Sequence, residues 1–236
     1  MILFWRLLLG HLLADFPLQS EFVDTWKRKG TWGMVAHAAI HLAASVLLCW
    51  PFLDDLWVDT SLFRFQGWTC VLLVTIAHYL EDEWRVFAIL KHKAPDNTIF
   101  FLWDQVVHGA VLGTLLTVHD PWYESGFLPE KWPVLACLAV FAVSVAAKLA
   151  YYADKDRFDS PPPVLDERWV AGTERTLVFA AFLLPGPWGW AVPAALAWAA
   201  YLLRSRLRLD YSWLGFWLGG ACAAGAGILA RAVWYS

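Results

Sequence analysis

Apolar segments long enough to cross a membrane recur along the whole chain. A spanning helix needs about 20 predominantly apolar residues, with a range of roughly 17 to 25. Charge clusters and Pro/Gly breaks delimit eight such segments, at residues 2–20, 33–52, 67–90, 98–118, 133–153, 170–185, 188–204 and 212–234. The sixth and seventh are short and are separated only by PGPWG. The sequence therefore predicts an all-α fold, a polytopic integral membrane helix bundle with about seven to eight transmembrane helices.

The composition supports this class of protein. Of the 236 residues, 59% are hydrophobic and 17% are charged, whereas soluble domains average roughly 45 to 50% apolar and about 25% charged residues. Many of the 17 tryptophans end apolar segments, where their rings suit the headgroup layer, so membrane lipids are expected partners. The net charge of -3 argues against a nucleic-acid partner. The four cysteines occur singly, without CxxC spacing, and are interpreted as buried apolar side chains.

Basic residues predict the orientation, because cytoplasmic loops collect Lys and Arg. The first, third, fifth and seventh loops contain such clusters, and the intervening loops contain almost none. We expect the odd-numbered loops to be cytoplasmic and both termini to face away from the cytoplasm. The apolar N-terminal run has no small-residue cleavage site after it and is expected to remain as the first span.

One long polar stretch interrupts the apolar pattern. Residues 154–169, DKDRFDSPPPVLDERW, contain three prolines that cannot occupy a helix interior. The stretch is interpreted as an exposed cytoplasmic linker, with five spans before it in residues 1–153 and three after it in residues 170–236. The whole chain, residues 1–236, is predicted to form a single transmembrane domain.

Each of the first four predicted helices contains two metal-competent side chains four residues apart. Such a spacing places both side chains on the same face of a helix, one turn apart. Judged from the flanking lysines, all four pairs lie at a similar depth below the cytoplasmic surface. The pairs are His11 and Asp15, His37 and His41, His78 and Asp82, and Asp104 and His108.

A bound cation would explain why these groups are tolerated in apolar helices. An ionisable residue at the centre of a helix in lipid costs from about 2.5 kcal/mol to much more. Imidazoles and carboxylates are common ligands of divalent metals, with zinc favoured here and iron or manganese as alternatives. Five histidines and three aspartates exceed the ligands of one zinc ion, so one or two ions are expected. Two other interpretations remain: polar residues hydrogen-bonded across helices, and a haem on His37 or His41, which leaves the aspartates unexplained.

Further polar residues near the pairs could complete a site. Gln19, Glu81, Gln105 and Arg85 lie within about one turn of a pair, and Glu174 and Arg175 stand near the cytoplasmic end of the sixth span. Lys27 or Arg85 could hold an anionic head group, or both could be ordinary cytoplasmic anchors. Glu174 and Arg175 could bind substrate or form an internal ion pair. Asp24, Glu83 and Asp96 are interpreted as solvated.

Several strings resemble a known family. They are GHLLADFPLQSEFV followed by a lysine, HAAIH, AHYLEDEWR, WDQVVH and AGTERTLVFAAFLLPG. Together they resemble the uncharacterised bacterial polytopic membrane family catalogued as domain of unknown function 3307, over most of the chain to about residue 205. The acidic run at 81–83 is denser than the family pattern, and the eighth span has no clear counterpart. The resemblance implies a bacterial cytoplasmic (inner) membrane protein, distantly similar to membrane-bound metal-dependent hydrolases. The family motif positions are His11, Asp15, Gln19, His37, His78, Asp82, Asp104, Gln105, His108, Glu174 and Arg175.

The leading hypothesis is a membrane-embedded, metal-dependent hydrolase that acts on an ester, phosphoester or amide of a lipid-like substrate. A metal-bound water is activated towards attack on such bonds. Glu81 is expected to act as a general base, and Gln105 is a second candidate catalytic residue. Two other functions remain open: a di-iron membrane oxidoreductase, and a non-catalytic accessory subunit of a larger membrane complex.

Overall fold

The structure, a computed structural model, describes residues 1–119, 128, 130–207 and 212–236. The chain divides into two compact units, Met1–Pro133 (unit 1) and Val134–Ser236 (unit 2). Helices dominate both units, as the sequence predicts. Within the described ranges, three helices are long and apolar enough to cross a membrane, Thr31–Phe52, Lys131–Phe158 and Trp213–Tyr235. The single transmembrane domain over residues 1–236 remains a prediction.

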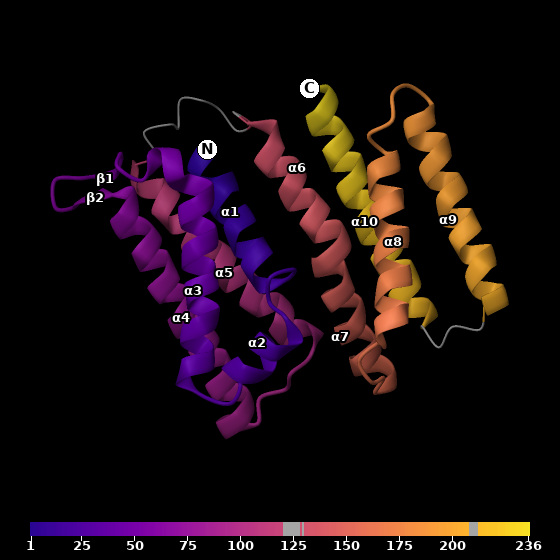
Figure 1. Ribbon diagram of the computed structural model, residues 1–236, viewed down its shortest axis with the longest axis horizontal. Helices are drawn as coiled ribbons and strands as arrows, with labels where there is room; N and C mark the ends of the chain where they lie inside the picture. Colours follow the sequence, from indigo (N-terminus) through magenta and orange to yellow (C-terminus); the bar gives the residue numbers. More distant parts are fainter. Residues whose placement is uncertain (120–127, 129, 208–211) are drawn as a thin grey trace. The chain divides into compact units, whose positions relative to one another are not determined.

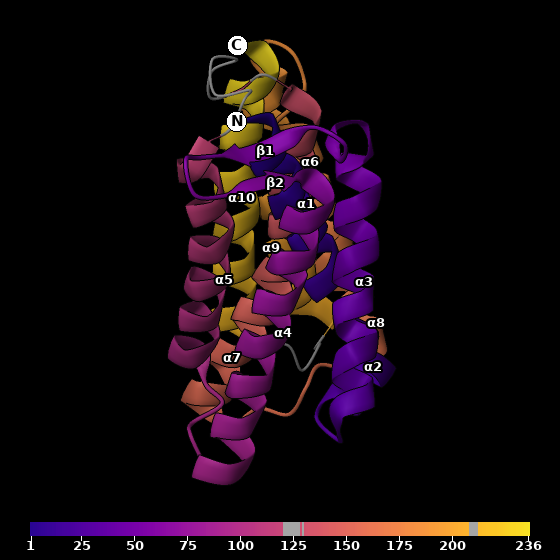
Figure 2. The ribbon, with the colours of Figure 1, turned by 90° about the vertical axis from the view of Figure 1, so that its left-hand side faces the viewer.

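Unit 1 is built around four long helices, which run side by side (Figures 1 and 2). Each packs against two others, in the order α1, α3, α4, α5 and back to α1. The four helices therefore enclose a common interior. The described elements of unit 1 are α1 (Ile2–Asp15), α2 (Glu21–Lys27), α3 (Thr31–Cys49), the 3₁₀ turn η1 (Trp50–Phe52), β1 (Leu56–Asp59), β2 (Arg64–Gln66), α4 (Gly67–His92) and α5 (Thr98–His119).

The first predicted span is wrong in its length, because α1 ends at Asp15 and a separate helix follows. Pro17 has no backbone N–H and disfavours helical geometry in the residue before it. Ser20 then caps the short helix α2, its side chain accepting a hydrogen bond from the backbone of Val23. Gly33 allows α2 to lie directly against α3, since a Cβ at this position would stand only 2.2 Å from the carbonyl oxygen of Trp26.

A small β-hairpin, which the sequence analysis did not predict, lies at the same end of unit 1 as the N-terminus (Figure 2). Its strands β1 and β2 are antiparallel, with Leu56 opposite Gln66. Trp57 is buried and donates a hydrogen bond from its indole to the carbonyl of Phe52. The apolar core of unit 1 occupies this end and includes Leu3 and Leu53.

All regular elements in the described part of unit 2 are helices. Its described elements are α6 (Lys131–Val140, whose first residues belong to unit 1), the π-helical turn η3 (Phe141–Val145), α7 (Ala146–Phe158), α8 (Leu165–Ala181), α9 (Trp188–Leu207) and α10 (Trp213–Tyr235). The predicted linker 154–169 is shorter than expected, because α7 continues to Phe158 and α8 begins at Leu165. Within residues 154–169, only the segment 159–164, which contains the three prolines, lies outside a helix.

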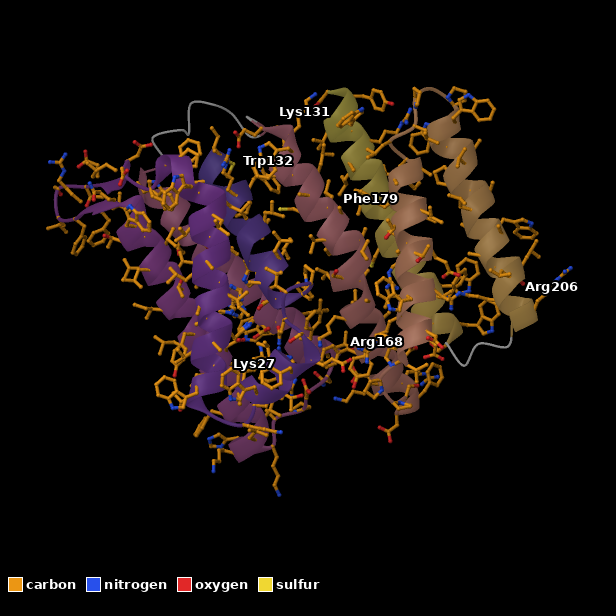
Figure 3. The ribbon with its side chains drawn as sticks, viewed as in Figure 1. Lys27, Lys131, Trp132, Arg168, Phe179 and Arg206 are labelled. Atoms are coloured by element: carbon orange, nitrogen blue, oxygen red, sulfur yellow. The ribbon has the colours of Figure 1, made fainter. Side chains whose placement is uncertain are left out.

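Figure 3 shows where several basic residues lie within each unit. In unit 1, Lys27 lies at the end opposite to Lys131 and Trp132. In unit 2, Arg168 and Arg206 share the same end. The orientation of the loops relative to a membrane remains a prediction.

Candidate metal centre

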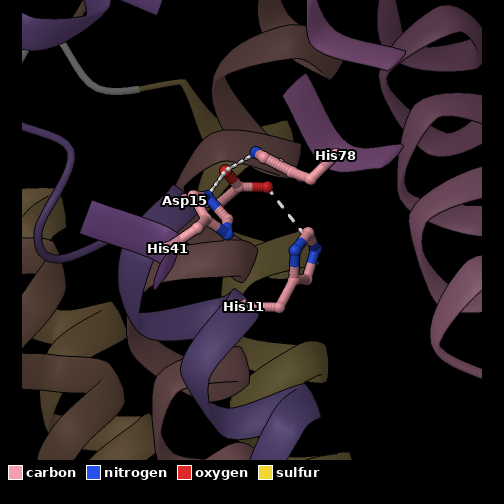
Figure 4. A group of neighbouring side chains, drawn as sticks. All are labelled: His11, Asp15, His41 and His78. Atoms are coloured by element: carbon pink, nitrogen blue, oxygen red, sulfur yellow. Dashed lines mark hydrogen bonds and ion pairs between the residues drawn. The ribbon is translucent and has the colours of Figure 1, made fainter. Parts of the chain in front are cut away.

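The four predicted pairs converge in the interior of unit 1. Asp15 lies at the centre: the Nε2 atoms of His37 and His41 stand 3.1 and 2.9 Å from its Oδ1 atom. The Nε2 atom of His78 is 3.7 Å from the same oxygen, and that of His11 is 3.4 Å from the other oxygen, Oδ2. Figure 4 shows His11, His41 and His78 pointing towards this carboxylate. Side chains of α1, α3 and α4 thus meet around one anion.

Asp82 and Asp104 extend the group towards α4 and α5. The Oδ2 atom of Asp82 is 3.2 Å from the Nε2 atom of His37 and 3.6 Å from that of His78. Three sets of ligand atoms, each within 4.8 Å of one another, share members: His11, Asp15, His41 and His78; His37, His78 and Asp82; Asp82, Asp104 and His108. We call these eight residues the His/Asp cluster. Their convergence is as the sequence predicts, and their role as metal ligands remains a prediction.

Small residues bring the helices close enough for this convergence. A Cβ on Gly10 would stand 3.4 Å from the backbone nitrogen of Ser45, so α1 and α3 pack with little side-chain volume between them. Ala14 and Ala38 are also buried, each next to or near a cluster member in the sequence. The imidazoles therefore reach across a narrow interior, and His37 is 0% exposed.

A small cavity lies on one side of the cluster. Its volume is about 10 Å³, which is about the minimum space for one water molecule. Glu81, Ser45 and several apolar residues line it. Four histidines of the cluster also line it, namely His11, His41, His78 and His108. The Nε2 atom of His108 and the Oε2 atom of Glu81 are 3.4 Å apart; both are buried, and neither forms a hydrogen bond with a described residue. These two atoms are available to a group in the cavity.

Two cations balance the aspartates on the other side. Lys27 is buried, and its Nζ atom donates to Asp82 over 3.0 Å. Burial alone would lower the pKa of Lys27. The negative charges of Asp82 and Asp15 have a larger, opposite effect, so the pKa of Lys27 is raised above its ordinary value. Arg85 donates to Asp104 over 3.1 Å. Both cations therefore belong to the interior network, which the interpretation as cytoplasmic anchors did not predict.

Comparison with known proteins assigns this unit to a family. The family described as protein of unknown function (DUF3307) matches residues 3–125. The chain belongs to the DUF3307 family. The matched segment lies within unit 1 and contains the entire His/Asp cluster. No curated protein and no solved structure matches the chain.

Of the remaining predicted residues, some contact the His/Asp cluster and others do not. Gln105 donates to Asp104 over 3.1 Å and so contacts the cluster. Gln19 instead donates to Asp24. The string at 171–186, which includes Glu174 and Arg175, falls outside the family match and lies in unit 2. Here Glu174 binds Arg204, so the expected internal pair between Glu174 and Arg175 is wrong.

Two parts of the network around the His/Asp cluster differ from the interpretation of the sequence. Asp96 is not simply solvated, because Arg85 and Arg28 each donate to it over 3.4 Å. Lys27 enters the interior because α2 is a separate helix that folds back onto α3. Pro17 followed by Ser20 is a helix break and a helix N-cap, and this signal could have predicted α2.

Proposed function

We propose that this DUF3307 protein holds one or two divalent ions, zinc first, in the His/Asp cluster and hydrolyses an ester, phosphoester or amide bond of a lipid-borne substrate. One observation carries the proposal. Histidines from four different helices direct ring nitrogens at Asp15, at each other and at Glu81, inside a buried interior. Such a concentration of imidazoles in apolar helices needs a compensating partner.

The spacing of the donor atoms supports a metal. Ligands at about 2.0 to 2.2 Å from a tetrahedral zinc ion lie about 3.3 to 3.6 Å from one another. The separations between Asp15 oxygens and histidine Nε2 atoms range from 2.9 to 3.7 Å, which brackets that value. Little rearrangement would be needed to admit an ion.

The charge balance supports a divalent ion. With neutral imidazoles and ionised carboxylates, Asp15, Glu81, Asp82 and Asp104 carry four negative charges. Lys27 and Arg85 offset two of them. Two negative charges remain, and one divalent cation would neutralise them. Compensation is needed because an uncompensated buried charge is strongly destabilising.

Each neighbouring residue has a role in the proposed reaction. A bound divalent ion would lower the pKa of its water towards neutrality and polarise the bond under attack. Glu81 lines the cavity with a carboxylate oxygen that accepts no hydrogen bond from a described residue, and it would accept the proton of the attacking water. Lys27 orients Asp82, and Gln105 and Arg85 orient Asp104.

The protein would lie in the membrane. Seven to eight helices would cross the bacterial inner membrane, with the odd-numbered loops in the cytoplasm. The basic end of unit 1, at Lys27, would then face the cytoplasm, and the cluster would lie just below that surface. A lipid-borne substrate would reach it without leaving the membrane.

Elemental analysis of the purified full chain tests the metal site. We expect one or two zinc ions per chain in the wild type, and less metal in His37→Ala and Asp104→Ala. His92→Ala is the matched control, because His92 is exposed and outside the cluster. Iron with redox-dependent absorption would instead support an oxidoreductase. Equal metal content in all four proteins, or no metal in any, would refute the site and leave the accessory-subunit function.

A second measurement separates the reaction from the site. Glu81→Gln should keep its metal but lose hydrolysis of fluorogenic lipid esters, phosphodiesters or amides in vesicles. General acid–base catalysis contributes about 10² to 10⁴-fold, so the rate should fall by that factor. A metal-loaded wild type that cleaves none of these lipids would contradict the hydrolase function while leaving the metal site standing.

A further inference from the structure

A second, larger pocket lies in unit 2 between α8, α9 and α10. Its volume is about 420 Å³, within the range of about 300 to 1,000 Å³ for small-molecule sites. One end is apolar and includes Phe182, whose ring packs edge-on against Trp190 at 5.8 Å between centroids. The other end contains the charged groups Glu174, Arg175 and Arg204. The pocket is therefore amphiphilic along its length.

The shape of the pocket suits a linear molecule. On α9 its lining extends from Trp190 to Arg204, which is about 21 Å at 1.5 Å per residue. Between these ends the α9 wall consists of Pro193 and three small residues, Ala194, Ala197 and Ala200. Small side chains leave an elongated apolar space, as an acyl chain requires.

The charges at the polar end are not balanced within the described part of the chain. Arg204 is neutralised by Glu174, which accepts from its Nε atom over 3.1 Å. Arg175 is only 6% exposed, forms no ion pair with any described residue, and its Nε atom has no hydrogen-bond partner. Its Nη1 atom lies against α10, since a Cβ on Gly219 would stand 3.3 Å away. One buried positive charge is left over.

The guanidinium of an arginine is always charged in proteins, so this imbalance persists unless an anion binds. Charged residues inside membrane helices normally have a partner and mark a functional site. An anion entering the pocket would provide that partner. The apolar walls then require that the anion carry a long hydrocarbon chain.

We propose that unit 2 binds a single-chain anionic amphiphile, with its carboxylate or phosphate head on Arg175 and its acyl or alkyl chain between α8, α9 and α10. This inference does not rest on the metal chemistry of unit 1. It gives Arg175 a specific ligand class.

Photo-crosslinking of the full chain in nanodiscs tests the proposal. Three diazirine probes with the same hexadecyl chain are compared: a fatty acid, an alkyl phosphate and a neutral alcohol. Hydrogen bonds to charged groups favour an anionic head by about tenfold or more. We expect one or both anionic probes to label peptides of α8 to α10 at least about tenfold more than the alcohol, and the stronger one identifies the head group. Equal labelling by the alcohol would overturn the proposal.

Three variants locate the binding. Arg175→Gln should lower anionic labelling about tenfold, and Ala197→Phe should abolish it by filling the pocket. Ala197 is exposed on the pocket wall, so this change disturbs no buried packing. Arg206→Gln removes the same charge from an exposed position on α9 and should label like the wild type. All variants are first shown to unfold at the wild-type temperature. Wild-type labelling of Arg175→Gln, or an equal loss in Arg206→Gln, would show that the inference is wrong.

Discussion

Replacing Lys27 with methionine tests the charge balance of the His/Asp cluster. Lys27 donates to Asp82 over 3.0 Å, and their side chains are only 9% and 4% exposed. Lys27→Met keeps most of the side-chain volume but removes the charge. Asp82 would then be left as a buried anion without its closest cation.

The expected loss of stability in Lys27→Met is large. Breaking one partner of a buried ion pair costs about 3 to 5 kcal/mol. For a chain of this size, each kcal/mol corresponds to about 2 to 4 °C in unfolding temperature, so Lys27→Met should unfold about 6 to 20 °C lower. The double variant Lys27→Met/Asp82→Asn should lose less, because no uncompensated charge remains.

Thermal unfolding of chelator-treated protein in detergent, followed by tryptophan fluorescence, measures these differences. Lys29→Met is the matched control, because Lys29 is exposed near the same helix end, and surface changes usually stay within about 0.5 kcal/mol. Equal unfolding temperatures for Lys27→Met and Lys29→Met would refute the reasoning.

The pH dependence of this loss has a definite sign. Because the pKa of Lys27 is raised above 10.5, its stabilising contribution is fully present below that pH and is lost only as the pH rises through the higher folded value. The difference between Lys27→Met and the wild type should therefore be the same at pH 7 and pH 9. A difference that shrinks by pH 9 would show that Lys27 is not held as a cation.

Three further changes test the fold and the site. Gly33→Ala should destabilise the protein by about 1 to 3 kcal/mol in thermal unfolding, because its Cβ would overlap the Trp26 carbonyl. By contrast, a Cβ at Gly113 meets no described atom within 4 Å, so Gly113→Ala should be neutral or better. Ser20→Ala should cost about 0.5 to 2 kcal/mol in the same assay by removing the cap of α2; an unchanged unfolding temperature would contradict a stabilising role for this cap. Chelation should lower the unfolding temperature of the wild type and zinc should restore it. Zinc at 1,000-fold excess over Kd should stabilise the folded state by about 4 kcal/mol. An unfolding temperature that responds to neither would contradict a bound ion.

The helices and their histidine pairs followed from the sequence because both are local properties. Apolar runs between charge clusters set the positions of α3, α4 and α5, and a spacing of four residues places two side chains on one helix face whatever surrounds it. The pairs His37 and His41, or His78 and Asp82, were therefore visible before any packing was known. The equal depth of the pairs then indicated that they would meet.

Packing between distant segments decided the rest. Lys27 is an ordinary loop cation in the sequence, and only the return of α2 onto α3 buries it against Asp82, 55 residues away. The hairpin β1–β2 depends in part on the burial of Trp57 against the bundle, and the partner of Glu174 is Arg204 because α8 lies beside α9. Periodicity fixes the direction of a side chain on its own helix, but its partner depends on which helices pack together and at what height, and that is a property of the whole chain.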